Sequence, residues 1–312
     1  MDALAVILER PEHLSVQRLP LEPANGSDAV VAIAWSGIST GTERLLWSGR
    51  MPSFPGMGYP LVPGYESVGT IVEADEAGAV RVGQTVFVPG ARCFGTVRGL
   101  FGGAASHLVS PAHRLVPVDA GLGEAACLLA LAATAYRALG GIRPGATPLI
   151  VGHGVLGRLL ARLTLAAGAA PTVWERDAIR RAGDHGYAVL APDDDPRRDY
   201  AVITDVSGDA SGLDALIARL ASGGEIVLAG FYEAPLSFAF PPAFMREARI
   251  RISAEFRPDD LAAVTRLIDG GRLSLDGLIT HRAPAVDAEG AYRTAFSDPA
   301  CLKMILDWRD AA

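Results

Sequence analysis

The chain has 312 residues, half of them apolar, which is enough for more than one hydrophobic core. Its 28 lysines and arginines stand against 35 acidic residues, and the net charge of −7 argues against a nucleic-acid groove, which needs a positive stripe. The three cysteines lie far apart and form neither a disulfide framework nor a CxxC metal motif, so we expect a reducing, cytoplasmic setting.

We expect no targeting segment and no integral membrane segment. The first ten residues mix acidic and basic side chains, unlike a signal peptide. The longest apolar stretch, residues 125–135, is too short to cross a bilayer.

The first 120 residues predict a small, mostly antiparallel β domain. Short apolar runs rich in valine are separated by glycine and proline, and no long stretch has a helical period. These runs are AVVAIAWSGI (29–38), SVGTIVEA (67–74), QTVFVPGA (84–91) and HLVSPAHRLVPV (107–118).

Residues 121–275 predict a second domain of a different kind. An alanine- and leucine-rich helix over 124–139 ends at two glycines. Six apolar runs then alternate with helical patterns, which indicates a doubly wound parallel sheet covered on both faces. The runs are PLIVG (148–152), APTVWE (170–175), YAVLA (187–191), YAVITDVSG (200–208), GEIVLAGF (224–231) and IRISAEF (250–256). The tail, 276–312, mixes strand and helix patterns.

A glycine motif, G-x-G-x-x-G, follows the first of these runs and opens a helix. Such glycines allow a tight turn, leave room for a pyrophosphate and let the helix pack on the strand. The free N–H groups of the helix N-terminus then face the phosphates. The predicted cofactor-binding residues of this motif are Gly152, His153, Gly154, Val155, Leu156 and Gly157. The alternative is that the glycines only pack a turn. His153 can reach the cofactor phosphates, but a solvent-exposed spacer is the favoured interpretation of this residue.

The next strand ends in an acid, Glu175, eighteen residues after Gly157. A carboxylate there binds the ribose hydroxyls of NAD and repels the 2′-phosphate of NADP. Arg176 follows it and could accept a 2′-phosphate. Because the acid comes first, we predict NAD as the cofactor, with Glu175 and Arg176 both close to the ribose.

The order of a β domain, a cofactor domain and a return segment resembles the medium-chain dehydrogenase/reductase superfamily. The resemblance rests on SGISTGTE (36–43), VPGYESVGTIVE (62–73), RVGQTVFV (81–88) and the glycine motif. It implies an α/β fold in which a GroES-like β domain (1–120, completed by 276–312) joins a Rossmann domain (121–275).

The segment STGTERLLWSGRMPSFPGMGYPLVPGYE (39–66) and GLFGGAASHLV (99–109) are also similar to one family within the superfamily. That family is the 3-hydroxyethyl bacteriochlorophyllide a dehydrogenases of bacteriochlorophyll synthesis. The resemblance implies NAD-dependent oxidation of a 1-hydroxyethyl group on a tetrapyrrole macrocycle to an acetyl group.

The chain departs from the zinc alcohol dehydrogenases at the positions that hold their catalytic zinc. Ser39 stands where a cysteine is expected and Tyr65 where a histidine is expected. Ala130 or Leu131 takes the place of the third ligand. Zinc needs three or four nitrogen, sulfur or carboxylate donors. We therefore expect no metal.

Without a metal, a side chain must accept the proton of the alcohol or pass it to water. The candidate catalytic residues are Tyr65, His107, Ser39 and Glu66. Tyr65 can relay a proton or merely fill the space of the metal site. Glu66 can act as a base, although anchoring its loop or contacting an arginine is the favoured role. His107 is chemically the best base, yet a lone histidine is often a surface group.

A segment rich in aromatic residues predicts the substrate wall, where flat rings would stack on a macrocycle. The candidate substrate-binding residues are Thr40, Arg44, Trp47, Phe54 and Tyr59. Arg44 would pair with a propionate of the macrocycle. The alternative is a small core under a long loop.

Two other functions stay open at this point. One is a zinc-free quinone or enoyl reductase, and the other is a dinucleotide-binding protein without enzymatic activity. Members of the superfamily are often dimers or tetramers, so a homo-oligomer is also open.

Overall fold

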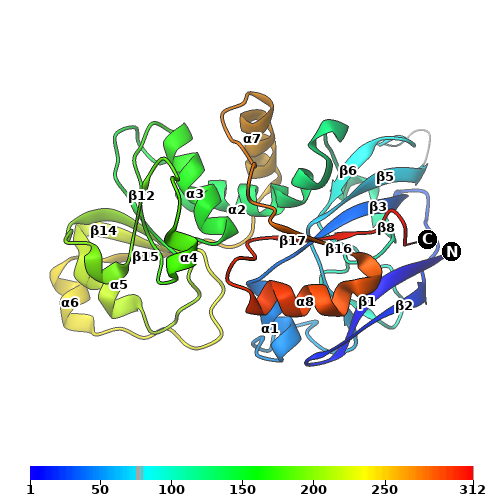
Figure 1. Cartoon of the computed structure of the whole chain (residues 1–312), viewed down its shortest axis with the longest axis horizontal. Helices are drawn as coiled ribbons and strands as arrows, with labels where there is room; N and C mark the ends of the chain where they lie inside the picture. The colour runs from blue at the N-terminus through cyan, green and yellow to red at the C-terminus, as the bar shows by residue number, and fades with distance from the viewer. Residues whose placement is uncertain (75–77, 79, 312) are drawn as a thin grey trace. The chain divides into compact units, whose positions relative to one another are not determined.

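The computed structural model describes residues 1–74, 78 and 80–311. They form two compact units, one of Met1–Ala130 with Asp276–Ala312 and one of Leu131–Leu275 (Figure 1). The first unit takes in residues 121–130, because the 3-10 segment Ala120–Leu128 packs against strands of the first unit.

Among its described residues the first unit holds a seven-stranded sheet and a four-stranded sheet. The larger sheet has the order β16-β17-β3-β5-β6-β9, and β8 also pairs with β3. Its strands are β3 (Asp28–Ile38), β5 (Ser67–Ala74), β6 (Thr85–Val88), β8 (His107–Pro111), β9 (Val116–Pro117), β16 (His281–Pro284) and β17 (Met304–Asp307). The smaller sheet consists of β2 (His13–Pro20), β1 (Asp2–Arg10), β4 (Leu61–Val62) and β7 (Arg98–Gly99).

The C-terminal segment completes the larger sheet of this unit. β17 pairs antiparallel with β3, so that Met304 lies opposite Ile38 at the end of that strand. Two helices belong to the unit, α1 (Thr42–Ser48) and α8 (Ala288–Ser297), and they lie side by side (Figure 1). Short 3-10 turns occupy Ala112–Arg114 and Ala285–Asp287.

The second unit is built on a six-stranded sheet in the order β12-β11-β10-β13-β14-β15, within the described residues. All its pairings are parallel, and β10 lies between β11 and β13, as the Rossmann pattern requires. The six predicted runs each form one of its strands, which confirms the doubly wound sheet. The strands are β10 (Leu149–Val151), β11 (Thr172–Trp174), β12 (Ala188–Leu190), β13 (Tyr200–Asp205), β14 (Leu220–Leu228) and β15 (Arg249–Ile252).

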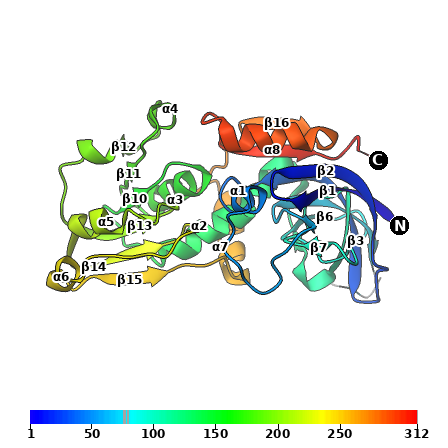
Figure 2. The same ribbon diagram turned by 90° about the horizontal axis from the view of Figure 1, so that it is seen from below.

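Helices cover this sheet because the strands are apolar on both faces. Leu149 and Ile150 are consecutive in β10 and so point to opposite faces, and both are fully buried. The helices are α2 (Leu129–Leu139), α3 (Val155–Ala166), α4 (Ala178–Arg181), α5 (Leu213–Arg219), α6 (Phe240–Met245) and α7 (Pro258–Asp269), with a 3-10 turn at Pro192–Asp194. Figure 2 shows α6 beside the ends of β14 and β15.

One helical segment of the described residues, Ala120–Leu139, is long and apolar enough to cross a membrane by length and composition. It is longer than the stretch 125–135 considered above. Half of its most apolar stretch is buried inside the protein, and the backbone at Gly123 does not have a helical conformation. A buried core helix has the same composition, so the segment is weak evidence for a membrane span.

Candidate functional site

A serine and a tyrosine that the sequence singled out form a hydrogen-bonded pair. Ser39 directly follows β3 and Tyr65 closely precedes β5, and the antiparallel pairing of these strands brings the two together. The Ser39 Oγ lies 2.7 Å from the Tyr65 hydroxyl. The Tyr65 ring meets Phe101 edge-on, with centroids 5.5 Å apart.

Burial, together with the nearby charge of Glu66, raises the pKa of the Tyr65 phenol, and the hydrogen bond to Ser39 opposes the rise. Tyr65 therefore stays neutral near pH 7. A neutral phenol can donate one hydrogen bond and accept another, which is what a proton relay needs.

Glu66 and Lys303 form an ion pair that is sealed from solvent. Their side chains are 0% and 1% exposed, and Lys303 Nζ lies 2.5 Å from Glu66 Oε2. The same ammonium donates to the carbonyl of Ile38 at 3.1 Å. Burial raises the pKa of Glu66, and the attraction of Lys303 opposes that rise. The sequence suggested that Glu66 anchors its loop or contacts an arginine, and the structure gives it a lysine from the distant C-terminal segment.

One oxygen of this carboxylate, Glu66 Oε1, is buried without a hydrogen-bond partner within the part of the chain that the structure describes. The other lies so close to the strand β3 that a Cβ added at Gly37 would meet Glu66 Oε2 at 2.3 Å. Only glycine leaves room for the pair at this position.

A second buried acid, Glu43, holds the turn that carries Ser39. Its Oε1 accepts the Ser39 backbone N–H at 3.0 Å, and its Oε2 accepts the hydroxyl of Tyr292 at 2.6 Å. Tyr292 belongs to α8, which lies beside α1 (Figure 1). Burial raises the Glu43 pKa from 4.5 to about 7, while these two hydrogen bonds lower it and the charge of Glu66 raises it further.

We call these six side chains the buried cluster, of which Tyr65 is half-buried and the others are buried: Ser39, Glu43, Tyr65, Glu66, Tyr292 and Lys303. Ser39, Tyr65 and Glu66 were named as candidates from the sequence, and Glu43 lies in the motif SGISTGTE (36–43). Tyr292 and Lys303 were missed. A signal existed for Lys303, because it is the only lysine in a chain with 28 basic residues. No comparable signal marks Tyr292, which lies 249 positions from the glutamate that it contacts.

The structure places His107 apart from this cluster. His107 begins β8, is half-buried, and its Nδ1 lies 3.2 Å from the Ser106 hydroxyl. Burial lowers the pKa of the imidazole, which favours its neutral form. Among the contacts of the described residues, none links His107 to Tyr65 or Ser39.

The predicted substrate wall lies largely against the core of the first unit. Trp47, Phe54 and Tyr59 are partly buried against that core, and the Tyr59 hydroxyl donates to the carbonyl of Leu46. Trp47 also packs on Phe296, with centroids 5.6 Å apart. These are the contacts of a small core, one of the two interpretations above, and the binding role of the three rings stays a prediction.

The two other predicted substrate-binding residues have different surroundings. Thr40 is half-buried in the turn after Ser39, whereas Arg44 is exposed on α1. Their roles in binding also stay predictions.

The glycine motif of the second unit has the room and the donors that a dinucleotide needs. A Cβ at Gly157 would lie 1.9 Å from the carbonyl oxygen of Gly152, so the helix α3 can approach the strand only through glycine. A Cβ at Gly154 would meet nothing within 4 Å, which leaves open space beside the loop. α3 begins with Val155 and Leu156 and carries no side-chain cap.

No side chain caps the N–H groups of that first turn, which leaves them available to an anionic ligand such as a pyrophosphate. Glu175 lies at the end of β11, and each of its oxygens accepts a single backbone N–H, from His153 at 3.0 Å and from Asp177 at 2.9 Å. Carboxylate oxygens accept two hydrogen bonds each, so acceptor capacity remains for ribose hydroxyls.

His153 differs from the exposed spacer that was the alternative reading of the motif. Its side chain is fully buried, and both ring nitrogens are engaged by the protein, at Arg180 and Tyr187. The expectation of solvent exposure was wrong because residues 180–187 fold over the imidazole.

Arg176 is held by an acid on a neighbouring loop. Its side chain is 78% exposed, and Nη1 lies 3.0 Å from Asp209 Oδ2. The charge of the guanidinium is therefore partly neutralised by this ion pair.

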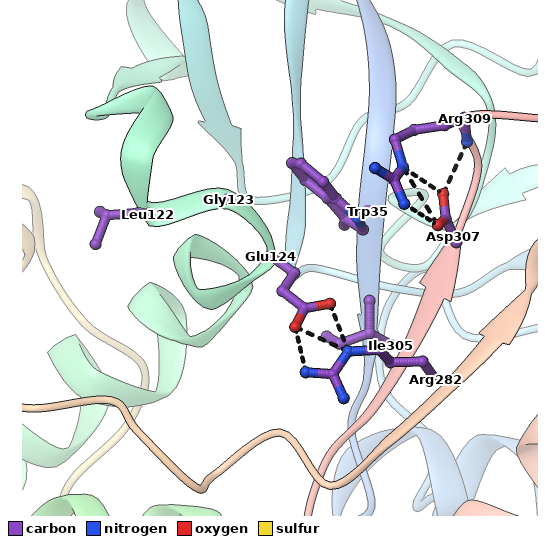
Figure 3. A pocket seen from close by; sticks show the side chains of 8 residues that line it. All are labelled: Trp35, Leu122, Gly123, Glu124, Arg282, Ile305, Asp307 and Arg309. Atoms are coloured by element: carbon purple, nitrogen blue, oxygen red, sulfur yellow. Dashed lines mark hydrogen bonds and ion pairs between the residues drawn. The ribbon is translucent and has the colours of Figure 1, made fainter.

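Two hollows lie elsewhere on the surface of the two units. One of about 380 Å³ in the first unit contains Trp35 between two ion pairs, Arg282 with Glu124 and Arg309 with Asp307 (Figure 3). The other, of about 990 Å³, lies in the second unit near the C-terminal end of α2. Neither is lined by Tyr65 or the glycine motif, so the candidate site rests on side-chain contacts.

The fold and the glycine motif together define a medium-chain dehydrogenase/reductase. Residues 25–120 match the alcohol dehydrogenase GroES-like domain family. The solved structure of acetophenone reductase from Geotrichum candidum, in complex with NAD, has a TM-score of 0.82 at 20% identity. The match covers 99% of this chain and 98% of that one.

Two relatives narrow the class. They are the 2-desacetyl-2-hydroxyethyl bacteriochlorophyllide A dehydrogenases of Rhodobacter capsulatus and Cereibacter sphaeroides, each 58% identical to this chain. Each alignment covers 100% of this chain and 100% of the relative. The chain therefore belongs to the family of these bacteriochlorophyllide dehydrogenases, which confirms the family that the sequence resembled.

Proposed function

We propose that the protein oxidises the 3-(1-hydroxyethyl) group of a bacteriochlorophyllide to an acetyl group with NAD. The observation that carries the proposal is the Ser39–Tyr65 pair, a neutral hydroxyl relay in a chain 58% identical to dehydrogenases named for that substrate. Ser39 and Tyr65 stand at the positions where the zinc enzymes have metal ligands. In this chain we therefore assign the removal of the alcohol proton to these two hydroxyls.

The reaction removes a hydride from the carbon and a proton from the hydroxyl of the substrate. NAD, when bound, supplies the acceptor of the hydride. Tyr65 takes the proton of the alcohol as it passes its own phenolic proton to Ser39, 2.7 Å away, and Ser39 passes its hydroxyl proton to water, so that neither hydroxyl is left charged. Glu43 fixes the backbone of Ser39, and Lys303 balances the charge of Glu66 beside the phenol.

The preference for NAD over NADP rests on two carboxylates. Glu175 offers acceptors to ribose hydroxyls, and Asp209 pairs with Arg176, the cation that would otherwise attract a 2′-phosphate. Titration of the purified protein with both dinucleotides tests this part, and tighter binding of NADP would contradict it.

Independence from metal is a further part of the proposal. The Ser39 and Tyr65 oxygens bond to each other, and Glu66 is taken by Lys303. Within the described residues no three histidine, cysteine or acidic side chains gather in a way that could hold a metal ion. Turnover should survive a strong chelator, and zinc-dependent recovery of a lost activity would contradict this part.

The decisive experiment follows the pigment itself. With NAD, the enzyme should shift the long-wavelength absorption band of hydroxyethyl bacteriochlorophyllide as the new carbonyl joins the conjugated ring. Tyr65→Phe should lose turnover and keep cofactor affinity, and His107→Ala provides the matched comparison for the other candidate base. No shift, together with rapid reduction of a simple quinone, would assign the chain to the quinone reductases instead.

We also propose a cytoplasmic homo-oligomer that associates through the edge of the second sheet. β15 is the last strand of that sheet, and Ile252 on it is 69% exposed. Phe244 and Met245 of the adjacent α6 are 65% and 75% exposed (Figure 2). Two copies can pair such edges about a twofold axis. Light scattering should give a dimer or larger, and Ile252→Lys should shift it toward monomer.

A further inference from the structure

The histidine inside the glycine motif is tied to a segment that lies 27 to 34 residues further along the chain. His153 Nδ1 lies 2.8 Å from the carbonyl oxygen of Arg180, and Nε2 lies 2.9 Å from the hydroxyl of Tyr187. The imidazole is fully buried between these partners. Neither nitrogen is left to face a phosphate.

The contacts fix the tautomer of the ring. A carbonyl oxygen can only accept, so Nδ1 must carry the hydrogen and donate it to Arg180. Nε2 then accepts from the Tyr187 hydroxyl. Burial lowers the pKa of His153 to about 4, so the ring is neutral at physiological pH and this pattern is maintained.

An arginine of α3 reinforces the same connection. Arg158 Nε donates to the carbonyl of His153 at 3.2 Å, and its Nη2 donates to the carbonyl of Arg180 at 3.2 Å. The His185 ring packs against the imidazole, with centroids 4.6 Å apart. The loop and the segment 177–187 are thus joined by several contacts.

The connection reaches Glu175, the acid on which the proposed preference for NAD rests. The backbone N–H of His153 donates to Glu175 Oε2, and the N–H of Asp177 donates to Glu175 Oε1. Arg181 Nη1 donates to the carbonyl of Glu175 at 3.0 Å. Any shift of 177–187 away from the glycine loop would therefore move the Glu175 carboxylate.

We propose that His153 is a positioning residue for dinucleotide specificity, which through Arg180 and Tyr187 holds Glu175 at a fixed distance from the glycine loop. The inference rests on the proposed use of NAD and adds the residue that sets the preference. A carboxylate that is already in place binds the ribose diol without the cost of ordering its loop. The same fixed carboxylate repels a 2′-phosphate, whereas a loose one can turn away.

The test compares His153→Ala, Tyr187→Phe and Tyr200→Phe by calorimetric titration with NAD, NADP and ADP-ribose. Tyr200→Phe is the matched control, because it also removes a buried hydroxyl, which hydrogen-bonds to Asp195 at 2.8 Å and to Thr172, but Tyr200 has no contact with the glycine loop among the described residues. His153→Asn serves as the conservative variant, since its amide can offer an N–H to the carbonyl of Arg180.

In His153→Ala the Kd for NAD and for ADP-ribose should rise about tenfold, the effect of one lost hydrogen bond of ordinary strength. The Kd for NADP should change by less than about twofold, so the ratio of the two affinities falls. Tyr187→Phe should give a smaller change of the same kind, and His153→Asn should recover part of the loss. Tyr200→Phe should lower Tm and leave the ratio unchanged.

An unchanged ratio in His153→Ala would overturn the inference, whether the affinities are unaltered or fall equally as the protein loses stability. Tighter binding of NADP than NAD by the unaltered protein would instead overturn the proposed cofactor, and it would do so before any variant is made. The two failures are therefore distinguishable.

Discussion

The buried cluster of the first unit and the glycine loop of the second handle charge in opposite ways. In the cluster, the charges of Glu66 and Lys303 are satisfied by each other and sealed from water. The glycine loop instead leaves N–H donors of α3 without a side-chain cap, facing open space at Gly154. One region is electrostatically closed, and the other is complete only with an anionic ligand.

This difference predicts different weaknesses. A closed ion pair loses stability when either partner is removed, because the other stays buried without compensation. The glycine loop tolerates an added Cβ where there is open space, as at Gly154. It does not tolerate one where two backbone segments touch, as at Gly157. The following experiments test the contrast, beginning with the largest expected effect.

Lys303→Met should lower the free energy of unfolding by about 3–5 kcal/mol, because it leaves the Glu66 carboxylate buried and unpaired. Urea denaturation measures the loss. The double variant Lys303→Met with Glu66→Leu should recover most of it, since neither charge remains. A loss of less than about 1 kcal/mol in the single variant would show that the pair is not closed to water.

The pH dependence of stability should reveal Glu43. Its pKa is about 7 in the folded protein against 4.5 for an ordinary glutamate, so folding favours the protonated form. Its contribution is fully present below pH 4.5 and is lost as pH rises through 7. The shift corresponds to about 3 kcal/mol.

Denaturation curves at pH 5 and pH 8 provide the measurement. Glu43→Gln keeps the shape of the side chain but cannot titrate, so its stability should depend less on pH over this range. An equally steep decline in the variant would assign the dependence to another group.

Gly157→Ala and Gly154→Ala separate the two requirements of the glycine loop. The first places a Cβ 1.9 Å from the carbonyl of Gly152 and should cost about 1–3 kcal/mol of stability. The second meets nothing within 4 Å, so stability should change little while the Kd for NAD rises, because the methyl group fills the space beside the phosphates. Equal losses of stability in both variants would refute the distinction.

The contrast also explains what the sequence could predict. The glycine motif and the strand before it lie within ten residues. The alternation of apolar runs with helical patterns predicts the parallel sheet, so patterns of neighbouring residues were enough to predict both. The buried cluster joins Glu66 to a lysine 237 positions away. No local pattern specifies such a pair, so the sequence suggested only that Glu66 anchors its loop or contacts an arginine.

His153 was misjudged for a related reason. Its position inside a loop suggested exposure, whereas the fold brings Tyr187 and Arg180 over the ring. Burial of a loop residue depends on what packs over it from another segment. Ser39 and Tyr65 could be predicted because each lies in a short motif, and these motifs follow one another along the chain in the order that the family shows.

The smallest expected effect concerns the acid beside Arg176. Asp209→Asn removes the charge that pairs with this exposed guanidinium, so Arg176 becomes available to a 2′-phosphate. Exposed ion pairs contribute about 0.2–1 kcal/mol, which corresponds to a gain in NADP affinity of no more than about fivefold. NAD affinity should stay within experimental error, because Glu175 is unchanged. Titrations at low and high salt are informative here, since screening should reduce the gain. A gain that persists in the double variant Asp209→Asn with Arg176→Ala would mean that the phosphate contacts another cation.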